Sequence, residues 1–126
     1  MKIIVIGAGM YVTGRNNSGV GTVLSSLSQL SKELKIEKVT VVANSVASSK
    51  FVDAANIRIN KILNSSLQID YFDLEHNTIE NLLSTENYDC TIIATPDNLH
   101  FQQAFLSFQN YIHVLCVKPL VINTDE

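Results

Sequence analysis

Short runs of apolar residues, rich in β-branched side chains, recur along the chain and predict the strands of a sheet. Most of these runs are continuous rather than alternating, as expected for strands that are covered on both faces. Two of them end close to a proline, which lacks the N–H that a strand needs. The predicted strands are residues 2–6, 39–43, 69–72, 91–94 and 111–117.

Between the strands, apolar residues return every three or four positions, which is the spacing of one helix face. The predicted helices are residues 21–34, 45–55, 78–84 and 99–109. Asn77 is a candidate N-cap for the third helix, and residues 56–73 fit either a strand or a short helix in their first half. The inward positions are, in order, Val23, Leu24, Leu27 and Leu30; Val46, Phe51 and Val52; Ile79, Leu82 and Leu83; and Phe101, Ala104, Phe105 and Phe108.

The alternation of strands and helices predicts one α/β domain over residues 1–126, with a doubly wound parallel sheet. No internal repeat, low-complexity tract or linker divides the chain. Open parallel sheets bind ligands at the carboxyl ends of their strands, where the connections diverge. The candidate binding residues are therefore sought after each predicted strand.

Two glycines after the first predicted strand form the first candidate site. Gly7 and Gly9 lie where a dinucleotide-binding domain brings its backbone close to the diphosphate of the cofactor, beside a helix N-terminus. The alternative is that these glycines only end a strand, because similar glycine loops occur in folds that bind other nucleotides or nothing. The position favours a Rossmann-type nucleotide loop.

The third glycine of such a loop is displaced in this sequence. Regular spacing would place it at Val12, whereas the register of the following helix nominates Gly21. Residues 10–20 then form an enlarged phosphate loop, in which Met10 and Arg15 are candidate cofactor ligands. The alternative for Arg15 is a solvated loop charge.

The end of the second predicted strand bears on the choice between NAD and NADP. An acidic side chain is expected there if the ribose 2′-hydroxyl of NAD is bound, but the chain has Asn44 and Ser45, followed by Lys50. No carboxylate of this segment would repel a 2′-phosphate, and Ser45 or Lys50 could accept one. The segment therefore favours NADP, or use of both cofactors, over strict NAD. The alternative is that Asn44 or Ser45 only caps a helix.

The charge balance narrows the classes of partner. The formal net charge is −3, and Lys and Arg form no cluster, which argues against a nucleic-acid or anionic membrane surface. No Asp or Glu precedes Glu33, as a phosphate-binding segment would favour. Cys90 and Cys116 lie singly in apolar runs and predict free thiols in a reducing compartment, without a metal site. The short apolar start is no signal peptide or membrane span, so a cytoplasmic protein is expected.

The second half of the chain carries two motifs that resemble a known family. Residues 91–100 read TIIATPDNLH, and residues 113–120 read HVLCVKPL. Together with the opening Gly-Ala-Gly strand, they resemble the glucose–fructose oxidoreductase, inositol dehydrogenase and MocA family. Its members carry a strand ending in Thr-Pro and followed by a His, then a helix, then a strand running into Glu-Lys-Pro.

The resemblance implies an N-terminal Rossmann domain followed by an α/β substrate domain, and hydride transfer between NAD(P) and a hydroxyl of a sugar, inositol or related compound. The family lysine that reaches the reacting hydroxyl corresponds to Lys118, and the following proline, often cis, corresponds to Pro119. Thr95, Pro96 and His100 match positions that line the cofactor cleft. A lysine after a strand end can also share a proton with a hydroxyl on chemical grounds.

Two departures from the family pattern affect this interpretation. Val117 stands where the family has a glutamate, so one acceptor of hydrogen bonds is missing beside Lys118. The chain also stops at Glu126, before the substrate domain, and we expect the fragment alone to be inactive. The alternative function is a nucleotide-binding or regulatory protein that kept the fold and lost catalysis.

The last predicted strand is expected to form an open edge of the sheet. With no further strand and helix beside residues 111–117, its N–H and C=O groups are unpaired and its apolar side chains uncovered. We therefore expect homo-oligomers that associate near this edge.

Overall fold

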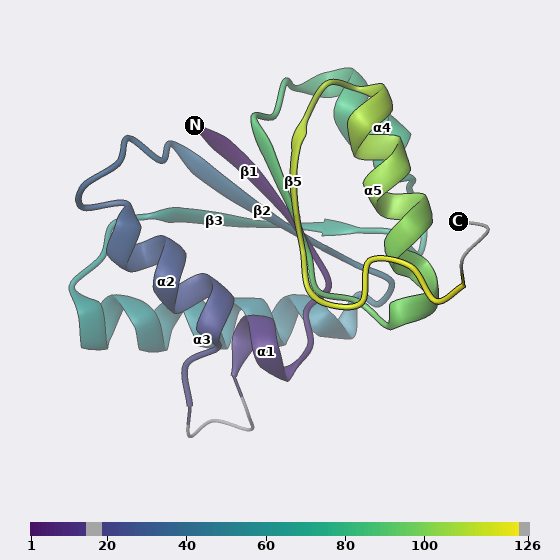
Figure 1. The fold of residues 1–126 in the computed structure, drawn as a ribbon. Helices are drawn as coiled ribbons and strands as arrows, with labels where there is room; N and C mark the ends of the chain where they lie inside the picture. The colour runs from purple at the N-terminus through teal and green to yellow at the C-terminus, as the bar shows by residue number, and fades with distance from the viewer. Residues whose placement is uncertain (15–18, 124–126) are drawn as a thin grey trace.

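The computed structural model describes residues 1–14 and 19–123. At its centre is a five-stranded parallel sheet in the order β3-β2-β1-β4-β5 (Figure 1). The strand order runs outward in both directions from β1, so the predicted doubly wound α/β fold is confirmed. The strands are β1 (Lys2–Ile6), β2 (Lys38–Ala43), β3 (Gln68–Asp73), β4 (Cys90–Ile93) and β5 (His113–Cys116).

Helices cover both faces of the sheet (Figure 1). One face carries α1 (Met10–Thr13), α2 (Thr22–Leu30) and α3 (Ala47–Leu63), and the other carries α4 (Ile79–Thr85) and α5 (His100–Gln109). A short 3-10 helix (Asp97–Leu99) leads into α5. Along β1, Ile3 and Val5 face the first layer, whereas Ile4 and Ile6 face the second. This double burial explains why the strand has no polar alternation.

The predicted inward face of α3 is wrong at two positions. Phe51 and Val46 are 58% and 52% exposed, and the buried residues are Val52, Ala55 and Ile59. These three residues are spaced by three and four, so they form one stripe on a helix that continues to Leu63. Residues 56–73, whose first half fits either a strand or a helix by its sequence pattern, are therefore helical up to Leu63.

The predicted inward face of α5 is wrong at Phe105 and Phe108, whereas Ala104 is buried as predicted. Phe105 and Phe108 are more than half exposed, while His100, Ala104 and Ser107 are buried. The small side chains let the helix approach the sheet closely, and the Ser107 hydroxyl donates to the Thr91 hydroxyl of β4 at 3.1 Å. The N-cap of α4 is Thr78 rather than Asn77, because its hydroxyl accepts from the Asn81 N–H at 3.2 Å.

A charged cluster closes the amino end of the sheet, far from the strand ends that bind ligands. Glu86 accepts hydrogen bonds from the ammonium groups of Lys2 and Lys38, and the Thr40 and Tyr88 hydroxyls lie 3.0 Å apart beside them. The hydrogen bonds from Lys2 and then Lys38 lower the pKa of Glu86 to about 2, and its bonds raise the pKa of both lysines. In the described part of the chain, no helix is long and apolar enough to cross a membrane.

Candidate functional site

A cleft of about 280 Å³ opens at the carboxyl ends of β1, β2 and β4. This is the edge at which doubly wound sheets bind nucleotides. The structure thereby gathers residues from three separate sequence segments at one place. The predicted site residues that line it are Gly7, Gly9, Asn44, Thr95 and Pro96.

Gly7 and Gly9 have different physical roles in this cleft. Gly7 has φ +111°, and a Cβ placed on it would lie 2.4 Å from the carbonyl oxygen of Ala94 at the end of β4. Only glycine fits such a conformation and contact. A Cβ on Gly9, by contrast, would meet no atom within 4 Å. The backbone at Gly9 is therefore open to a ligand in the cleft.

The chain after Gly9 differs from the expected loop. Residues 10–13 form the one-turn helix α1, capped by Gly9, rather than the start of an uninterrupted phosphate loop. Gly21 does not line the cleft, because it packs on α1, where a Cβ would lie 1.9 Å from the Val12 carbonyl oxygen. The helix that directly follows the glycine turn is α1, and Gly21 instead caps α2. Met10 begins α1 and is exposed.

Arg15 lies outside the described residues, but both ends of the segment that contains it are fixed. The Arg58 side chain on α3 donates through Nη2 to the Thr13 carbonyl oxygen at 3.1 Å and through Nε to the Gly19 carbonyl oxygen at 3.2 Å. Gly14 has φ +93°, and a Cβ on it would lie 2.3 Å from the Gly19 carbonyl oxygen. Sequence analysis missed Arg58, since nothing distinguishes it from other charged residues of a helix.

At the end of β2, the residues predicted to bind the adenosine ribose behave differently from one another. Asn44 lines the cleft. The Ser45 hydroxyl accepts from the Ala47 N–H at 3.2 Å, just before α3, whose N-cap is Val46. Lys50 is exposed on α3. The neighbouring Tyr71 of β3 donates to the carbonyl oxygens of Ala43 and Ser45 and holds this segment in place.

A carboxylate does reach the end of β2, contrary to the assumption behind the NADP prediction. Glu75, in the loop after β3, accepts a hydrogen bond from the Val46 N–H, with Oε2 3.4 Å from the nitrogen. Asp73 and His76 lie beside it, with Asp73 Oδ2 2.9 Å from His76 Nδ1. The bond from His76 lowers the pKa of Asp73, and the same contact raises the pKa of His76. No sequence pattern indicates the contact between Glu75 and Val46, because the two residues are 29 positions apart.

At the end of β4, Thr95 orients a residue that sequence analysis missed. Its hydroxyl donates to Gln103 Oε1 at 2.7 Å, and Gln103 lines the cleft. Among the described residues, the Gln103 amide nitrogen has no hydrogen-bond partner, so its two N–H groups are available to a ligand. Gln103 lies three residues after the family motif of residues 91–100, and the sequence does not show that the first turn of α5 directs its side chain back to Thr95.

His100 supports the cleft from behind instead of lining it. Its ring is fully buried, with Nε2 2.8 Å from the Thr95 carbonyl oxygen and Nδ1 2.6 Å from the Pro119 carbonyl oxygen. A ring N–H can donate to such an oxygen, so the imidazole links the two motif segments. The predicted placement of His100 on the cleft surface is therefore corrected to a position beneath it.

Lys118 lies in a second hollow, which adjoins the cleft through Ala94 and Thr95. The side chain is exposed, and among the described residues its ammonium forms no ion pair or hydrogen bond. Val117 and Tyr11 line the same hollow. The Lys118–Pro119 peptide bond is cis, as the resemblance implied.

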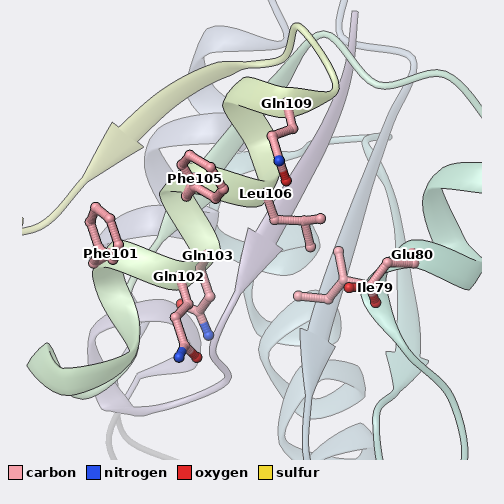
Figure 2. A pocket seen from close by; sticks show the side chains of 8 residues that line it. All are labelled: Ile79, Glu80, Phe101, Gln102, Gln103, Phe105, Leu106 and Gln109. Atoms are coloured by element: carbon pink, nitrogen blue, oxygen red, sulfur yellow. The ribbon is translucent and has the colours of Figure 1, made fainter. Parts of the chain in front are cut away.

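A separate groove runs over α5 and the start of α4 (Figure 2). Phe101 and Phe105 stack along it with ring centroids 6.0 Å apart, and Gln103 is the residue that it shares with the cleft. Glu80 is its one ionisable side chain. The groove therefore offers little chemistry beyond apolar contact and amide hydrogen bonds.

Comparison with known proteins agrees with this geometry. Residues 1–126 match the family described as "Oxidoreductase family, NAD-binding Rossmann fold", which is the Gfo/Idh/MocA family. The chain belongs to this family. The suspected resemblance is thus confirmed, together with the Rossmann fold and the nucleotide-binding class that it implies.

Two curated relatives of this Gfo/Idh/MocA chain are longer than the matched region. The uncharacterized oxidoreductase YgjR of Escherichia coli (strain K12) is 29% identical over 97 residues, which are 68% of this chain and 30% of YgjR. The scyllo-inositol 2-dehydrogenase (NADP(+)) IolU of Bacillus subtilis (strain 168) is 34% identical over 61 residues, 44% of this chain and 19% of IolU. The chain therefore spans less than a third of the length of these relatives.

Among solved structures, the WlbA dehydrogenase of Chromobacterium violaceum, in complex with NADH and UDP-GlcNAcA, superposes with a TM-score of 0.61. The match covers 99% of this chain and 29% of WlbA, at 17% identity. The myo-inositol dehydrogenase of Corynebacterium glutamicum gives a TM-score of 0.59 at 14% identity. At these identities the comparison establishes the shared fold.

Proposed function

We propose that residues 1–126 are the dinucleotide-binding domain of an NAD(P)-dependent oxidoreductase that acts on a hydroxyl of a sugar, inositol or related polyol. The observation that carries the proposal is the cleft at the strand ends, in which the backbone at Gly9 is uncovered and Gly7 is held by its positive φ. Rossmann domains bring the cofactor diphosphate to such a position. The cofactor class follows from the family, and the substrate is proposed from it.

The residues of the cleft fit a dinucleotide at three points. Open backbone at Gly9 leaves room for the diphosphate, Asn44 at the end of β2 is placed for the adenosine ribose, and the free amide N–H groups of Gln103 can donate to the cofactor. Thr95 and Pro96 form the wall on the β4 side. When bound, a nicotinamide dinucleotide supplies or accepts the hydride of the reaction.

We assign the proton-handling role to Lys118. Lys118 forms no ion pair in the described structure. As the neutral amine it can accept the proton of the substrate hydroxyl while the carbon is oxidised, and as the ammonium it can return that proton in the reverse reaction. His100 holds the Pro119 carbonyl and thereby positions this lysine. Pro119 is assigned to shaping the turn and not to contact with the cofactor.

The alternative function, a regulatory protein without catalysis, rests on Val117. This side chain shares the hollow with Lys118 and supplies no hydrogen-bond acceptor there. An enzyme would convert a polyol, whereas a regulatory protein would bind the dinucleotide without turnover. The comparisons favour the enzyme, since the family is one of oxidoreductases.

Binding of NADH, followed by nicotinamide fluorescence, tests the proposal. The unchanged protein should bind, and Gly9→Ala should weaken binding about tenfold or more, because the new methyl group occupies the space for the diphosphate. The thermal midpoint should hardly change, since that methyl group meets no protein atom. Failure of the unchanged protein to bind NADH or NADPH would refute the proposal.

Turnover tests the role of Lys118 separately. In a protein that also carries the family's substrate domain, Lys118→Met should abolish reduction of the oxidised cofactor by a panel of polyols and sugars while leaving NADH affinity unchanged. Equal loss of affinity would instead assign Lys118 to cofactor binding.

Self-association and location are further parts of the proposal. Within the described residues β5 pairs only with β4, and near this edge Tyr111 is 97% and Leu115 56% exposed. We propose that two copies associate there, so light scattering should report a dimer that Leu115→Lys dissociates.

A cytoplasmic location is supported by the free thiols of Cys90 and Cys116, whose pKa values are raised by burial.

A further inference from the structure

The loop after β3 lies beside the first residues after β2. The pairing of the two strands continues past their ends, where the Leu74 N–H donates to the Ala43 carbonyl oxygen at 2.9 Å. This brings Glu75 next to residues 44–46, which lead from the cleft into α3. Asn44 of the same segment lines the cleft itself.

The carboxylate of Glu75 accepts a hydrogen bond from a backbone N–H that could otherwise donate to a bound anion. Oε2 accepts from the N–H of Val46, the residue that caps α3, a helix of 17 residues. Uncapped N–H groups at the start of a helix attract anions, including phosphate groups. The position near the end of β2 is where the ribose 2′-oxygen of a dinucleotide is recognised. The negative charge of Glu75 therefore lies where a 2′-phosphate group would have to bind.

The other side chains around this position also disfavour binding of a 2′-phosphate. Asp73 is a second carboxylate of the loop, and its hydrogen bond with His76 uses the one imidazole nearby. Tyr71 holds the Ser45 carbonyl oxygen and contributes no positive charge. Among the described residues, no ion pair joins Lys50 to Glu75 or Asp73, and Lys50 is exposed. A 2′-phosphate dianion at the Val46 N–H would thus face the carboxylate of Glu75, with that of Asp73 beside it.

We infer that Glu75 selects NAD against NADP. It does so from the loop after β3, in place of an acidic residue at the end of β2. Its carboxylate can accept a hydrogen bond from the ribose hydroxyl of NAD and repels the 2′-phosphate of NADP. This inference rests on the proposed function, because it assigns the choice of cofactor within the same cleft.

Paired titrations with NADH and NADPH test the inference in three forms of the protein. The unchanged protein should bind NADH at least about tenfold more tightly than NADPH. Glu75→Gln, which keeps an oxygen to accept from Val46 but removes the charge, should narrow this ratio about fivefold, mainly by tightening NADPH. Glu80→Gln is the matched control, because it removes the same charge from the groove on α4 and α5, and its ratio should equal that of the unchanged protein.

Ionic strength provides a second readout that a structural effect would not give. Added salt screens charge repulsion, so the preference of the unchanged protein for NADH should fall with salt, while that of Glu75→Gln should change little. An unchanged ratio in Glu75→Gln, with NADH still bound, would overturn this inference and leave the proposed function standing. So would tighter binding of NADPH than NADH by the unchanged protein. If neither dinucleotide binds, the proposed function fails, and the inference fails with it.

Discussion

The imidazole of His100 and the backbone of Pro119 are directly linked, with Nδ1 2.6 Å from the carbonyl oxygen. The other ring nitrogen lies 2.8 Å from the Thr95 carbonyl oxygen. One fully buried side chain therefore fixes the loop after β4 and the loop after β5 relative to each other. The hollow that contains Lys118 lies between these two loops, and the loop after β4 also lines the proposed cofactor cleft.

His100→Ala should consequently lower the free energy of unfolding by about 2–4 kcal/mol, since it leaves a cavity and removes the imidazole N–H that donates to a carbonyl oxygen. Urea denaturation measures this loss, and hydrogen exchange should show faster exchange in residues 117–121. His113→Ala is the matched control, because His113 is exposed at the start of β5, and it should cost less than about 0.5 kcal/mol. Similar losses in both variants would contradict a linking role for His100.

Gly7→Ala should destabilise the fold severely. Its Cβ would lie 2.4 Å from the Ala94 carbonyl oxygen at a φ of +111°, which costs at least about 2 kcal/mol in strain and displacement. Gly9→Ala, two residues later, should change the free energy of unfolding by less than about 1 kcal/mol, since nothing occupies the space around it. Denaturation curves of the two variants compare a structural glycine with a ligand-facing one, and equal curves would refute the distinction.

Glu86→Gln should destabilise the protein at neutral pH but hardly at low pH. The folded pKa of Glu86 is about 2, below the ordinary value of 4.5, so its stabilising effect is complete above about pH 4.5 and is lost as the pH falls towards 2. The group is partly exposed, with 22% of its side-chain surface accessible. After allowance for solvent screening, we expect a loss of about 1–2 kcal/mol at neutral pH.

Urea denaturation of both proteins across this pH range checks the prediction. The difference between them should shrink steadily below about pH 4.5. Glu33→Gln serves as the control, because Glu33 is exposed and forms no ion pair within the described residues. A difference that persists undiminished at pH 2 would show that lost packing, and not charge, causes the effect.

Gln103→Leu should raise the dissociation constant for NADH about fivefold, which corresponds to one lost hydrogen bond. Gln103 lines the cleft, and its oxygen is held by the Thr95 hydroxyl. Its neighbour Gln102 lines only the groove over α5 (Figure 2), so Gln102→Leu should leave the dissociation constant unchanged. If both variants bind NADH as the unchanged protein does, Gln103 does not contact the cofactor.

The strands and the position of the glycine turn could be predicted because they depend on local sequence. A strand covered on both faces needs a continuous apolar run, and the run at β1 ends where Gly7 begins the turn. The faces of α3 and α5 were less predictable, because large apolar residues suggest burial more strongly than small ones do. Phe105 is exposed, whereas Ser107 is buried against β4. Close packing of a helix on a sheet selects small side chains, which hydrophobicity alone does not reveal.

Two of the residues that sequence analysis missed act through contacts between distant segments. Arg58 is 45 residues from Thr13, and Glu75 is 29 residues from Val46. Neither residue belongs to a motif, and each is an ordinary charged residue until the fold places it. The motif residues Thr95 and Lys118 could be found from sequence because the family pattern marks them, but the support of their loops by His100 required coordinates.

The hold of Arg58 on both Thr13 and Gly19 has a practical consequence for engineering this protein. The close approach of Gly14 to Gly19 closes the chain at the same point. The position of α1 relative to α2 therefore depends on Arg58. A redesigned version of this protein should keep that arginine, because its replacement would release both chain segments from α3 at once.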